Sequence, residues 1–254
     1  MRRYFILCGF IFSLLRLGAS SNEADARQLV ENSRQKLSLK NVHLSLNLET
    51  TDGKGNSKIK EMKVSFAQFD RLRKVLVEFT APEKVNGTKI LTTDYPDKKG
   101  IIEIYMPSTG RIQKFRASQR NLNMLGSEIP INQFSTVAGY KFTFTMLGKG
   151  TVNSTPCHKI KMYDPEEKGY GILFISVGKE QILRIEQYDS RDKLVRLTVM
   201  SEYMQVNNSG EHIYPKEIRV ENRKTGKTSR MTVHQINYIK QIRQEDFSLI
   251  PEAS

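Results

Sequence analysis

The sequence contains little cysteine and histidine, and no tryptophan. Only 2 Cys and 4 His occur among 254 residues, which excludes a cysteine-rich zinc module and a disulfide scaffold. Long apolar runs are missing except at the N-terminus, which excludes a polytopic membrane protein. The histidines have no metal-binding spacing, and neither a phosphate loop nor a nucleophile-elbow motif occurs. We therefore expect no enzyme, no cofactor and no metal site.

The chain instead has a basic excess and an ordinary apolar share. It carries 40 Lys and Arg against 27 Asp and Glu, a formal net charge of +13, and 38% of its residues are hydrophobic. Many basic residues, Lys58, Lys60, Lys63 and Arg73 among them, are expected on or beside the polar faces of strands. There they form either a solvated outer surface or a surface for transient contact with a membrane. Aromatic residues are not interleaved as a nucleic-acid platform requires, so we expect no nucleic-acid partner.

Residues 1–21 have the layout of a secretory signal peptide. A basic start precedes an apolar stretch, and the small residues Ala19 and Ser21 follow it. The stretch is shorter than the roughly 20 residues of a spanning helix, so we expect cleavage near Ser21, with an uncleaved anchor as the alternative. Cleavage removes three arginines and lowers the net charge to +10. The mature chain keeps one cysteine, Cys157, which we expect to be a half-buried strand residue.

An amphipathic helix is expected at residues 24–37. Ala26, Leu29 and Val30 recur near i, i+3, i+4 spacing with charged residues between them. Asn22 is a suitable N-cap for this helix. The helix therefore has one apolar face to bury.

After residue 41 the apolar period changes from 3.6 to 2, which predicts strands with one dry and one wet face. We count about 11 such runs with short turns between them, and no βαβ alternation, so the sheet is antiparallel. Residues 116–140 break the pattern and predict loop plus short helices. The fold class is therefore mainly β: a strongly curved antiparallel sheet, an incomplete or half β-barrel, covered by the N-terminal helix and a short helical lid. We expect a single domain at residues 22–254; an eight-stranded up-and-down barrel is the nearest alternative.

A curled sheet whose open side is covered encloses a cavity, and the apolar residues of this one suit acyl chains. The candidate ligand-binding residues are the apolar ones that alternate along the strands or lie in the lid segment. They are Leu44, Leu46, Leu48, Met62, Val64, Phe66, Val77, Phe79, Ile102, Ile104, Met124, Leu125, Ile129, Phe134, Phe142 and Phe144.

Several short motifs follow one another between residues 79 and 134. They are Phe79-Thr80-Ala81-Pro82, Asn86-Gly87-Thr88-Lys89-Ile90-Leu91, Ile102-Glu103-Ile104-Tyr105-Met106-Pro107, Met124-Leu125-Gly126-Ser127-Glu128 and, last, Phe134. In this order they resemble the outer-membrane lipoprotein-sorting protein family, relatives of the Lol lipoprotein carrier. The resemblance implies a periplasmic carrier with an open, incomplete β-barrel and a helical lid, which binds the acyl chains of a lipoprotein or another lipid.

The same resemblance implies roles for single residues. The lid residues Met124, Leu125, Ile129 and Phe134 would fill the empty cavity and swing out on loading, with Gly126 as the hinge. A second set is expected to be structural rather than to contact the ligand: Pro82, Gly87, Tyr105, Pro107 and Ser127.

The resemblance also implies partners. A carrier takes a lipid or an acylated lipoprotein from an inner-membrane transporter or donor complex to an outer-membrane acceptor. Two other functions stay open on the sequence. One is a periplasmic sensor that binds lipid or lipoprotein and regulates a membrane partner without transport; the other is an exported enzyme that acts on lipids or glycans.

Overall fold

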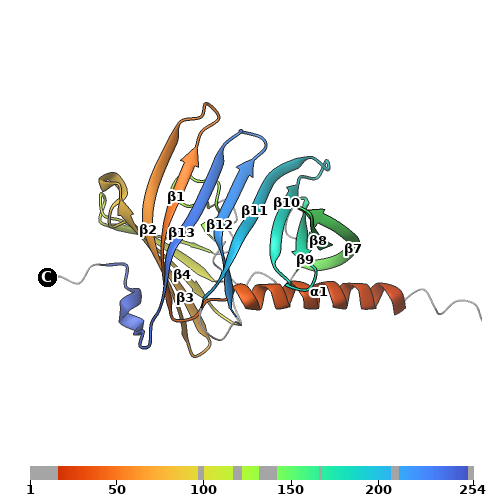
Figure 1. Cartoon of the computed structure of the whole chain (residues 1–254). Coiled ribbons are helices and arrows are strands. Elements are labelled where there is room, and N and C mark those ends of the chain that lie inside the picture. Colours follow the sequence, from red (N-terminus) through yellow and green to blue (C-terminus); the bar gives the residue numbers. More distant parts are fainter. Residues whose placement is uncertain are drawn as a thin grey trace, which may run out of the picture.

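In the part of the chain that the structure describes, a 13-stranded antiparallel sheet and one α-helix form the body of the protein (Figure 1). The computed structural model describes residues 17–96, 100–116, 122–131, 142–165, 168–206 and 212–250, with side chains from residue 22 onward. In the part of the chain so described, no helix is both long enough and apolar enough to cross a membrane.

The strands follow the chain from residue 42 to residue 238. They are β1 (Val42–Thr51), β2 (Ser57–Phe69), β3 (Leu72–Ala81), β4 (Lys89–Asp94), β5 (Ile101–Met106), β6 (Arg111–Arg116), β7 (Thr143–Val152), β8 (Thr155–Tyr163), β9 (Tyr170–Ser176), β10 (Ile182–Tyr188), β11 (Leu194–Gln205), β12 (Ile213–Asn222) and β13 (Thr228–Tyr238). Their order in the sheet is β6-β5-β4-β3-β2-β1-β13-β12-β11-β10-β9-β8-β7. The first and last strands thus meet in the middle, and β6 and β7 are the edges.

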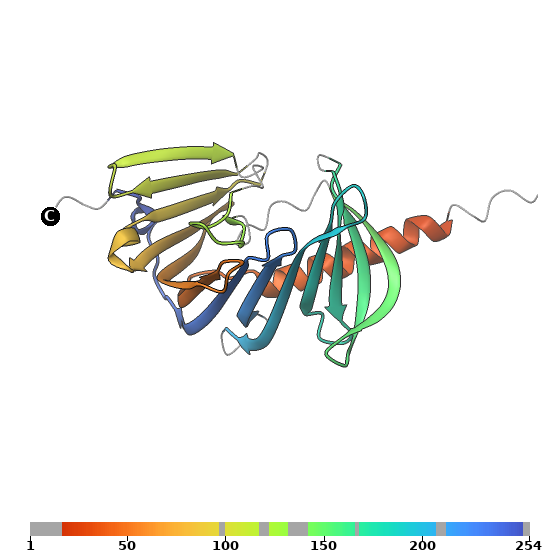
Figure 2. The same ribbon diagram turned by 90° about the horizontal axis from the view of Figure 1, so that it is seen from above.

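The sheet is curved but not closed. Figure 2 shows the β1–β6 half and the β7–β12 half turned toward each other, with a gap between the edge strands. Among the described residues β6 pairs only with β5, and β7 only with β8. The predicted incomplete barrel is therefore confirmed in its mainly antiparallel, open form.

The strand count exceeds the expected number of about 11. Two strands lack the alternation on which that count rested. Nearly every residue of β6 is exposed, and the last four residues of β9 are buried in a row. An exposed edge strand and a strand buried on both faces both hide the period of two.

Alternation is clear in the central strands. On β2, Met62, Val64 and Phe66 are buried, whereas Glu61 before them and Lys63 between them are exposed. The register places Leu46 of β1 opposite Met62 on one side and Val233 of β13 on the other. Buried side chains of neighbouring strands therefore lie on the same face of the sheet. That face is the concave one, because the cluster also includes buried residues of 122–131, a segment that lies within the curve of the sheet (Figure 2).

The helix α1 (Leu17–Leu37) begins earlier than predicted and ends where predicted. The expectation that Asn22 caps it was wrong, because Asn22 lies inside the helix. Its side-chain Oδ1 instead accepts a hydrogen bond of 2.9 Å from the backbone N–H of Met146. Asn22 therefore attaches the helix to β7.

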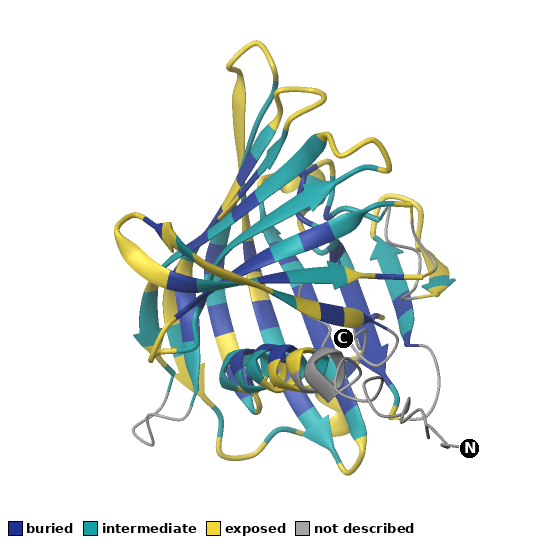
Figure 3. Cartoon of the chain, turned by 90° about the vertical axis from the view of Figure 1, so that its right-hand side faces the viewer, coloured by how far each residue is buried: buried dark blue, intermediate teal, exposed yellow. Residues whose placement is uncertain are grey.

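Helix α1 covers the concave face at the β7–β12 half (Figure 3). Ala26 and Val30 are buried in the same apolar cluster as the inward residues of the strands. The Arg27 guanidinium donates a hydrogen bond of 2.7 Å to the backbone oxygen of Phe142 and lies over the Phe144 ring. The amphipathic face predicted for this helix is thus confirmed, and it packs into the concave side of the sheet.

Residues 122–131, which we call the lid loop, lie within the curve of the sheet (Figure 2). They form tight turns closed by a β-bridge between Asn123 and Pro130, not a helix. The expected helical lid is therefore not confirmed in these residues; the remainder of the segment, 117–121 and 132–141, lies outside the described residues.

The convex face carries only small apolar clusters. One forms where the 3₁₀ helix η4 (Gln244–Phe247) lays Phe247 against Ala67, Leu76 and Leu91. The Phe247 and Phe69 rings meet edge to face at 5.7 Å between centroids. The C-terminal segment thus covers the outside of β2–β4, opposite the main core.

Candidate functional site

The concave face gathers the apolar residues that the sequence singled out. Every described one either belongs to a single buried cluster or packs against it, and only Ile104 and Leu125 are in the partly buried group. Phe134 lies outside the described residues. The cluster reaches from β5 through the sheet to the edge strand β7 and includes α1. The structure therefore brings these residues together on one apolar face. Their own side chains pack together there and fill the space inside the curve.

The lid loop is one unit with its own hydrogen bonds. The backbone N–H of Met124 donates to the oxygen of Ile129 at 2.9 Å, and that of Ser127 donates to the oxygen of Met124 at 2.7 Å. Ser127 Oγ also accepts a bond of 3.1 Å from the Ile129 N–H. Met124 and Ile129 are fully buried against the sheet. The loop is thus internally braced and presents an apolar underside.

Two side-chain hydrogen bonds fasten the lid loop to the sheet among the described residues, and both involve Glu128. Its backbone N–H donates to Ser229 Oγ of β13 at 2.8 Å. Its carboxylate accepts a bond of 2.8 Å from the side-chain amide of Asn222 on β12. Two bonds to neutral groups are a modest attachment, worth about 1–3 kcal/mol each with the charged acceptor at the upper end.

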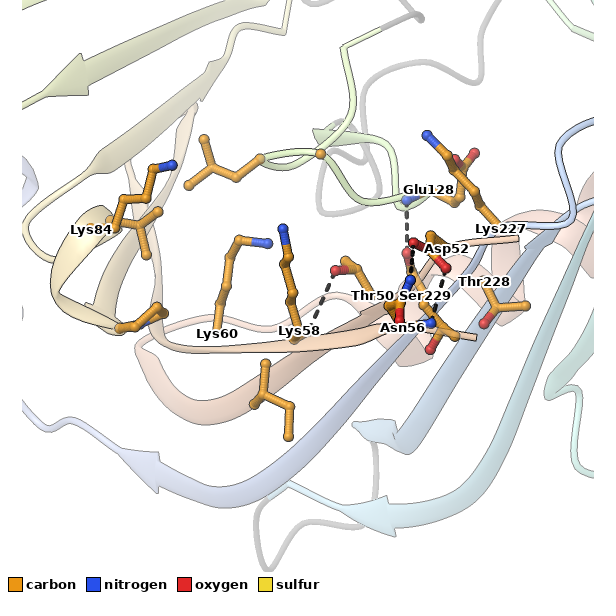
Figure 4. A pocket seen from close by; sticks show the side chains of 16 residues that line it. Thr50, Asp52, Asn56, Lys58, Lys60, Lys84, Glu128, Lys227, Thr228 and Ser229 are labelled. Atoms are coloured by element: carbon orange, nitrogen blue, oxygen red, sulfur yellow. Dashed lines mark hydrogen bonds between the residues drawn. The ribbon is translucent and has the colours of Figure 1, made fainter. Parts of the chain in front are cut away.

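A pocket of about 550 Å³ opens beside the tip of the lid loop (Figure 4). We call it the lysine pocket. It lies between the end of the β1–β2 hairpin, the 3₁₀ turn η1 (Glu83–Val85), the lid loop and the start of β13. Its lining residues are Thr50, Thr51, Asp52, Asn56, Lys58, Ile59, Lys60, Pro82, Lys84, Val85, Leu125, Gly126, Glu128, Lys227, Thr228 and Ser229.

Four lysines line this pocket, and sequence reasoning missed them as a group. Lys58 and Lys60 were expected on or beside the polar faces of strands, as part of a solvated outer surface. Lys58 is exposed and Lys60 half-buried, but both lie on the concave side of β2, so the expected face was wrong. They continue the inward row of Met62, because Lys60 pairs with the buried Leu48 and Lys58 with Thr50. The sequence did contain a signal for the inward face: both lysines are an even number of residues away from the buried Met62, and side chains two apart in a strand share a face. Only their charge suggested the outer face.

Arg73 was also expected on the outer face, and it is buried on the concave side. It precedes Val75 and Val77 in the inward row of β3 and lies opposite Asp94 of β4. Burial lowers the pKa of the Arg73 guanidinium, and the Asp94 carboxylate opposes that shift. Burial likewise lowers the pKa of Arg34 on α1, again against Asp94. These groups form a polar floor in the concavity between the helix and β3–β4.

Two other residues that could react chemically, Cys157 and Glu103, have surroundings typical of structural residues. Cys157 is buried on the convex side, and its burial raises the pKa of the thiol, which makes it a poorer nucleophile. Glu103 pairs with Lys114 at 2.8 Å on the outer face. Within the described ranges, no three His, Cys, Asp or Glu residues lie close enough to hold a metal ion.

The motif residues lie at turns and on the outer face. Gly87 has a φ of +74°, and a Cβ there would be 3.1 Å from the Pro107 side chain, so the β3–β4 and β5–β6 connections touch. Tyr105 packs against the convex cluster of Phe247. Gly126, with a φ of +76°, occupies the exposed tip of the lid loop. Pro82 lines the lysine pocket just before η1.

Solved structures share this architecture at low sequence identity. A domain assigned to an outer membrane lipoprotein-sorting protein from Vibrio parahaemolyticus superposes with a TM-score of 0.80 at 15% identity, over 89% of this chain and 97% of that one. A DUF1329 family protein from Desulfovibrio piger gives a TM-score of 0.80 at 16% identity, over 89% and 97%. A LolA superfamily protein from Nitrosomonas europaea gives 0.68 at 13% identity, over 88% and 97%.

Sequence comparison adds one family. No curated protein matches the chain. The model of a family described as "Uncharacterized protein"-like matches residues 71–249, well over half of the chain. The chain therefore belongs to that family, and it has the fold of the outer-membrane lipoprotein-sorting proteins that the motifs between residues 79 and 134 indicated.

Proposed function

We propose that the protein is a non-enzymatic periplasmic carrier, which binds a lipid or an acylated lipoprotein by taking the acyl chains into its concave face. The observation that carries the proposal is the single apolar cluster that lines this face from β5 to the edge strand β7 and is covered by α1 and the lid loop. The shared fold with lipoprotein-sorting proteins agrees with it. Residues 1–21 would be the signal peptide, and residues 22–254 the single carrier domain.

Loading requires a space that the protein's own side chains now fill. Met124 and Ile129 are fully buried, and Leu125 is partly buried against the same cluster. Burial of such side chains stabilises the closed loop by roughly 1.5–3 kcal/mol each. An acyl chain gains about 0.8 kcal/mol per buried CH₂, so some ten methylenes offset the departure of the loop. The exchange leaves a net affinity small enough for release.

The lid loop would move as one body. Its internal backbone bonds between Met124, Ser127 and Ile129 can stay intact while the two bonds from Glu128 to Ser229 and Asn222 break. Gly126 lies at the tip of the loop, beyond the Asn123–Pro130 bridge. A swing of the whole loop as one body would carry Gly126 with it, and the hinge role expected for Gly126 stays a prediction.

A carrier has a donor and an acceptor. We propose an inner-membrane transporter or donor complex on one side and an outer-membrane acceptor on the other, with transient contact at a membrane surface during exchange. The basic excess of the whole chain, 40 Lys and Arg against 27 Asp and Glu, favours contact with anionic headgroups.

Native mass spectrometry of the protein purified from a periplasm, with lipid extraction of the same sample, tests the proposal. We expect a co-purifying species with two or three acyl chains that is released when the fold is denatured. A mass equal to that of the protein alone, with no uptake after incubation with diacylglycerol or a diacylated peptide, would contradict the carrier function.

A matched pair of variants ties any bound lipid to the concave face. Ile104 faces the cluster from β5, whereas Ile112 on the neighbouring strand pairs with the outward Tyr105. We expect Ile104→Glu to abolish lipid uptake, because it puts a charge among the acyl chains. Ile112→Glu should keep uptake, since its side chain is already 37% exposed. Equal uptake by both variants would place the lipid elsewhere.

A further inference from the structure

The inward row of β2 changes character within one strand. From Phe66 to Met62 it is apolar and buried, and at Lys60 and Lys58 it becomes cationic. Figure 4 shows both lysines extending from β2 into the lysine pocket, with Lys84 on one side of them and Lys227 on the other. A cationic rim thus adjoins an apolar interior on the same face of the sheet.

The pocket adjoins the apolar interior. Two lining residues of the pocket, Val85 of η1 and Leu125 of the lid loop, also pack against the main cluster. Pro82 adds a further apolar wall. A molecule in the pocket would therefore touch cations at one end and reach the acyl-binding face at the other.

The two carboxylates at the pocket are engaged by neutral groups rather than by the lysines. Asp52 accepts hydrogen bonds of 2.9 Å from the backbone N–H groups of Lys54 and Asn56 and from the Asn56 side chain. Glu128 accepts its bond from Asn222. In the described part of the chain none of the four lysines forms an ion pair. The pocket thus carries four ammonium groups against two carboxylates that are already bonded.

Two of the lysines, Lys58 and Lys60, lie close enough together to repel each other. Burial lowers the pKa of the half-buried Lys60, and the nearby charge of the exposed Lys58 lowers it further. Like charges held close together are unfavourable unless an anion joins them. The hydroxyls of Thr50, Thr228 and Ser229 on the same walls supply further polar contacts for such an anion.

We propose that the lysine pocket is a subsite for the phosphate of an anionic lipid headgroup, so that the carrier prefers phospholipid-type ligands over neutral diacyl ones. The inference rests on the proposed acyl-binding function and refines its substrate class. The phosphate lies among Lys58, Lys60, Lys84 and Lys227, and the acyl chains run inward past Val85 and Leu125. No covalent step is involved.

Binding of three probes to the full mature chain tests this: dioctanoylphosphatidylglycerol, dioctanoylglycerol with the same chains, and inorganic phosphate. We expect the anionic lipid to bind at least about tenfold more tightly than the neutral one at low salt, a preference that shrinks as salt rises. Lys58→Gln/Lys60→Gln should reduce the preference to about twofold or less and leave the affinity for dioctanoylglycerol unchanged. That unchanged affinity also reports that the variant is folded.

Lys63→Gln/Lys74→Gln is the matched control. It removes the same charge from the convex side of β2 and β3, outside the pocket, and should keep the preference for the anionic lipid.

Equal affinities of the wild type for both lipids, or a preference that survives Lys58→Gln/Lys60→Gln, would overturn the headgroup site alone and leave the carrier function standing. Failure of both lipids to bind would overturn the carrier function and this inference with it. Lysine-dependent binding of inorganic phosphate to which acyl chains add nothing would mean a free-phosphate site and overturn the lipid headgroup.

Discussion

The two faces of the sheet are built from the same strands and are held in different ways. On the concave face one apolar cluster joins both halves of the sheet, α1 and the lid loop. On the convex face, exposed ion pairs are common, such as Arg230 with Glu49 at 3.6 Å and with Glu217 at 3.5 Å. A buried apolar side chain contributes about 1.5–3 kcal/mol and a half-exposed ion pair about 0–1 kcal/mol. The concave face therefore supplies most of the stability.

The difference between the two faces means that the proposed carrier binds its ligand at its own hydrophobic core. The face that would bind acyl chains is also the core that holds the fold, so a ligand must replace core contacts rather than fill an empty space. The lid loop suits that exchange, because only its Glu128 links to Ser229 and Asn222 tie it to the sheet by side-chain bonds among the described residues.

Removal of one large side chain from each face gives the largest expected contrast. Phe79 is fully buried on the concave side, and Phe247 of the C-terminal segment is buried against the convex side. We expect Phe79→Ala to lower the free energy of unfolding by about 3–5 kcal/mol. Phe247→Ala should cost less, roughly 1–2 kcal/mol, because the C-terminal segment can detach without opening the sheet. Urea unfolding measures both, and equal losses would contradict the comparison.

The lid attachment gives the next largest effect. Ser229→Ala removes the acceptor of the Glu128 N–H, a buried group, and should weaken the closed loop by about 1–3 kcal/mol. We expect faster amide hydrogen exchange in residues 122–131 and tighter lipid binding, because opening costs less. Ser65→Ala is the convex counterpart, since Ser65 Oγ lies 2.6 Å from His43 Nδ1 on the outer face. Ser65→Ala should change neither the hydrogen exchange of residues 122–131 nor the affinity for lipid. If Ser229→Ala also left both unchanged, contacts other than this hydrogen bond would hold the lid loop closed.

The charge of Lys60 gives a smaller effect that depends on pH. Its pKa lies below the ordinary 10.5 because of burial and the neighbouring Lys58. A rise in pH removes this ammonium first, so the affinity for dioctanoylphosphatidylglycerol should fall from a pH below 10.5 while the affinity for dioctanoylglycerol stays level. The loss from one charge is about fivefold, near 1 kcal/mol. Binding titrations across alkaline pH measure it, and Lys60→Gln should remove this first step.

The smallest effect is expected at an ion pair of the convex face. Arg230→Ala breaks its contacts with Glu49 and Glu217 and should change the free energy of unfolding by about 0–1 kcal/mol, since the arginine side chain is 46% exposed. The next residue, Met231, is fully buried on the concave side. Met231→Ala should cost about 2–5 kcal/mol. A large loss from Arg230→Ala would show that the convex network contributes more than its exposure implies.

Much of the concave lining could be predicted from the sequence, and its polar members could not. Leu44, Leu46 and Leu48 alternate so regularly that their shared face follows from strand geometry alone. Lys60 and Arg73 follow the same alternation, yet their charge pointed to the outside. Parity gives the face of a residue, and charge gives only the average cost of burying it. At the rim and floor of a concavity, parity was the better guide.

The sequence by itself determined three features: the open antiparallel β architecture, the amphipathic helix that ends at Leu37 and the resemblance to lipoprotein-sorting proteins. Each of them rests on local periodicity or on motifs that are contiguous in the chain. Only the tertiary structure decided which face is concave, since alternation defines two faces without saying how the sheet bends. It also decided that Lys58, Lys84 and Lys227 share one pocket with Glu128. These residues come from four distant segments, and only the pairing of β1 with β2 and β13, and the return of the lid loop across them, brings the segments together.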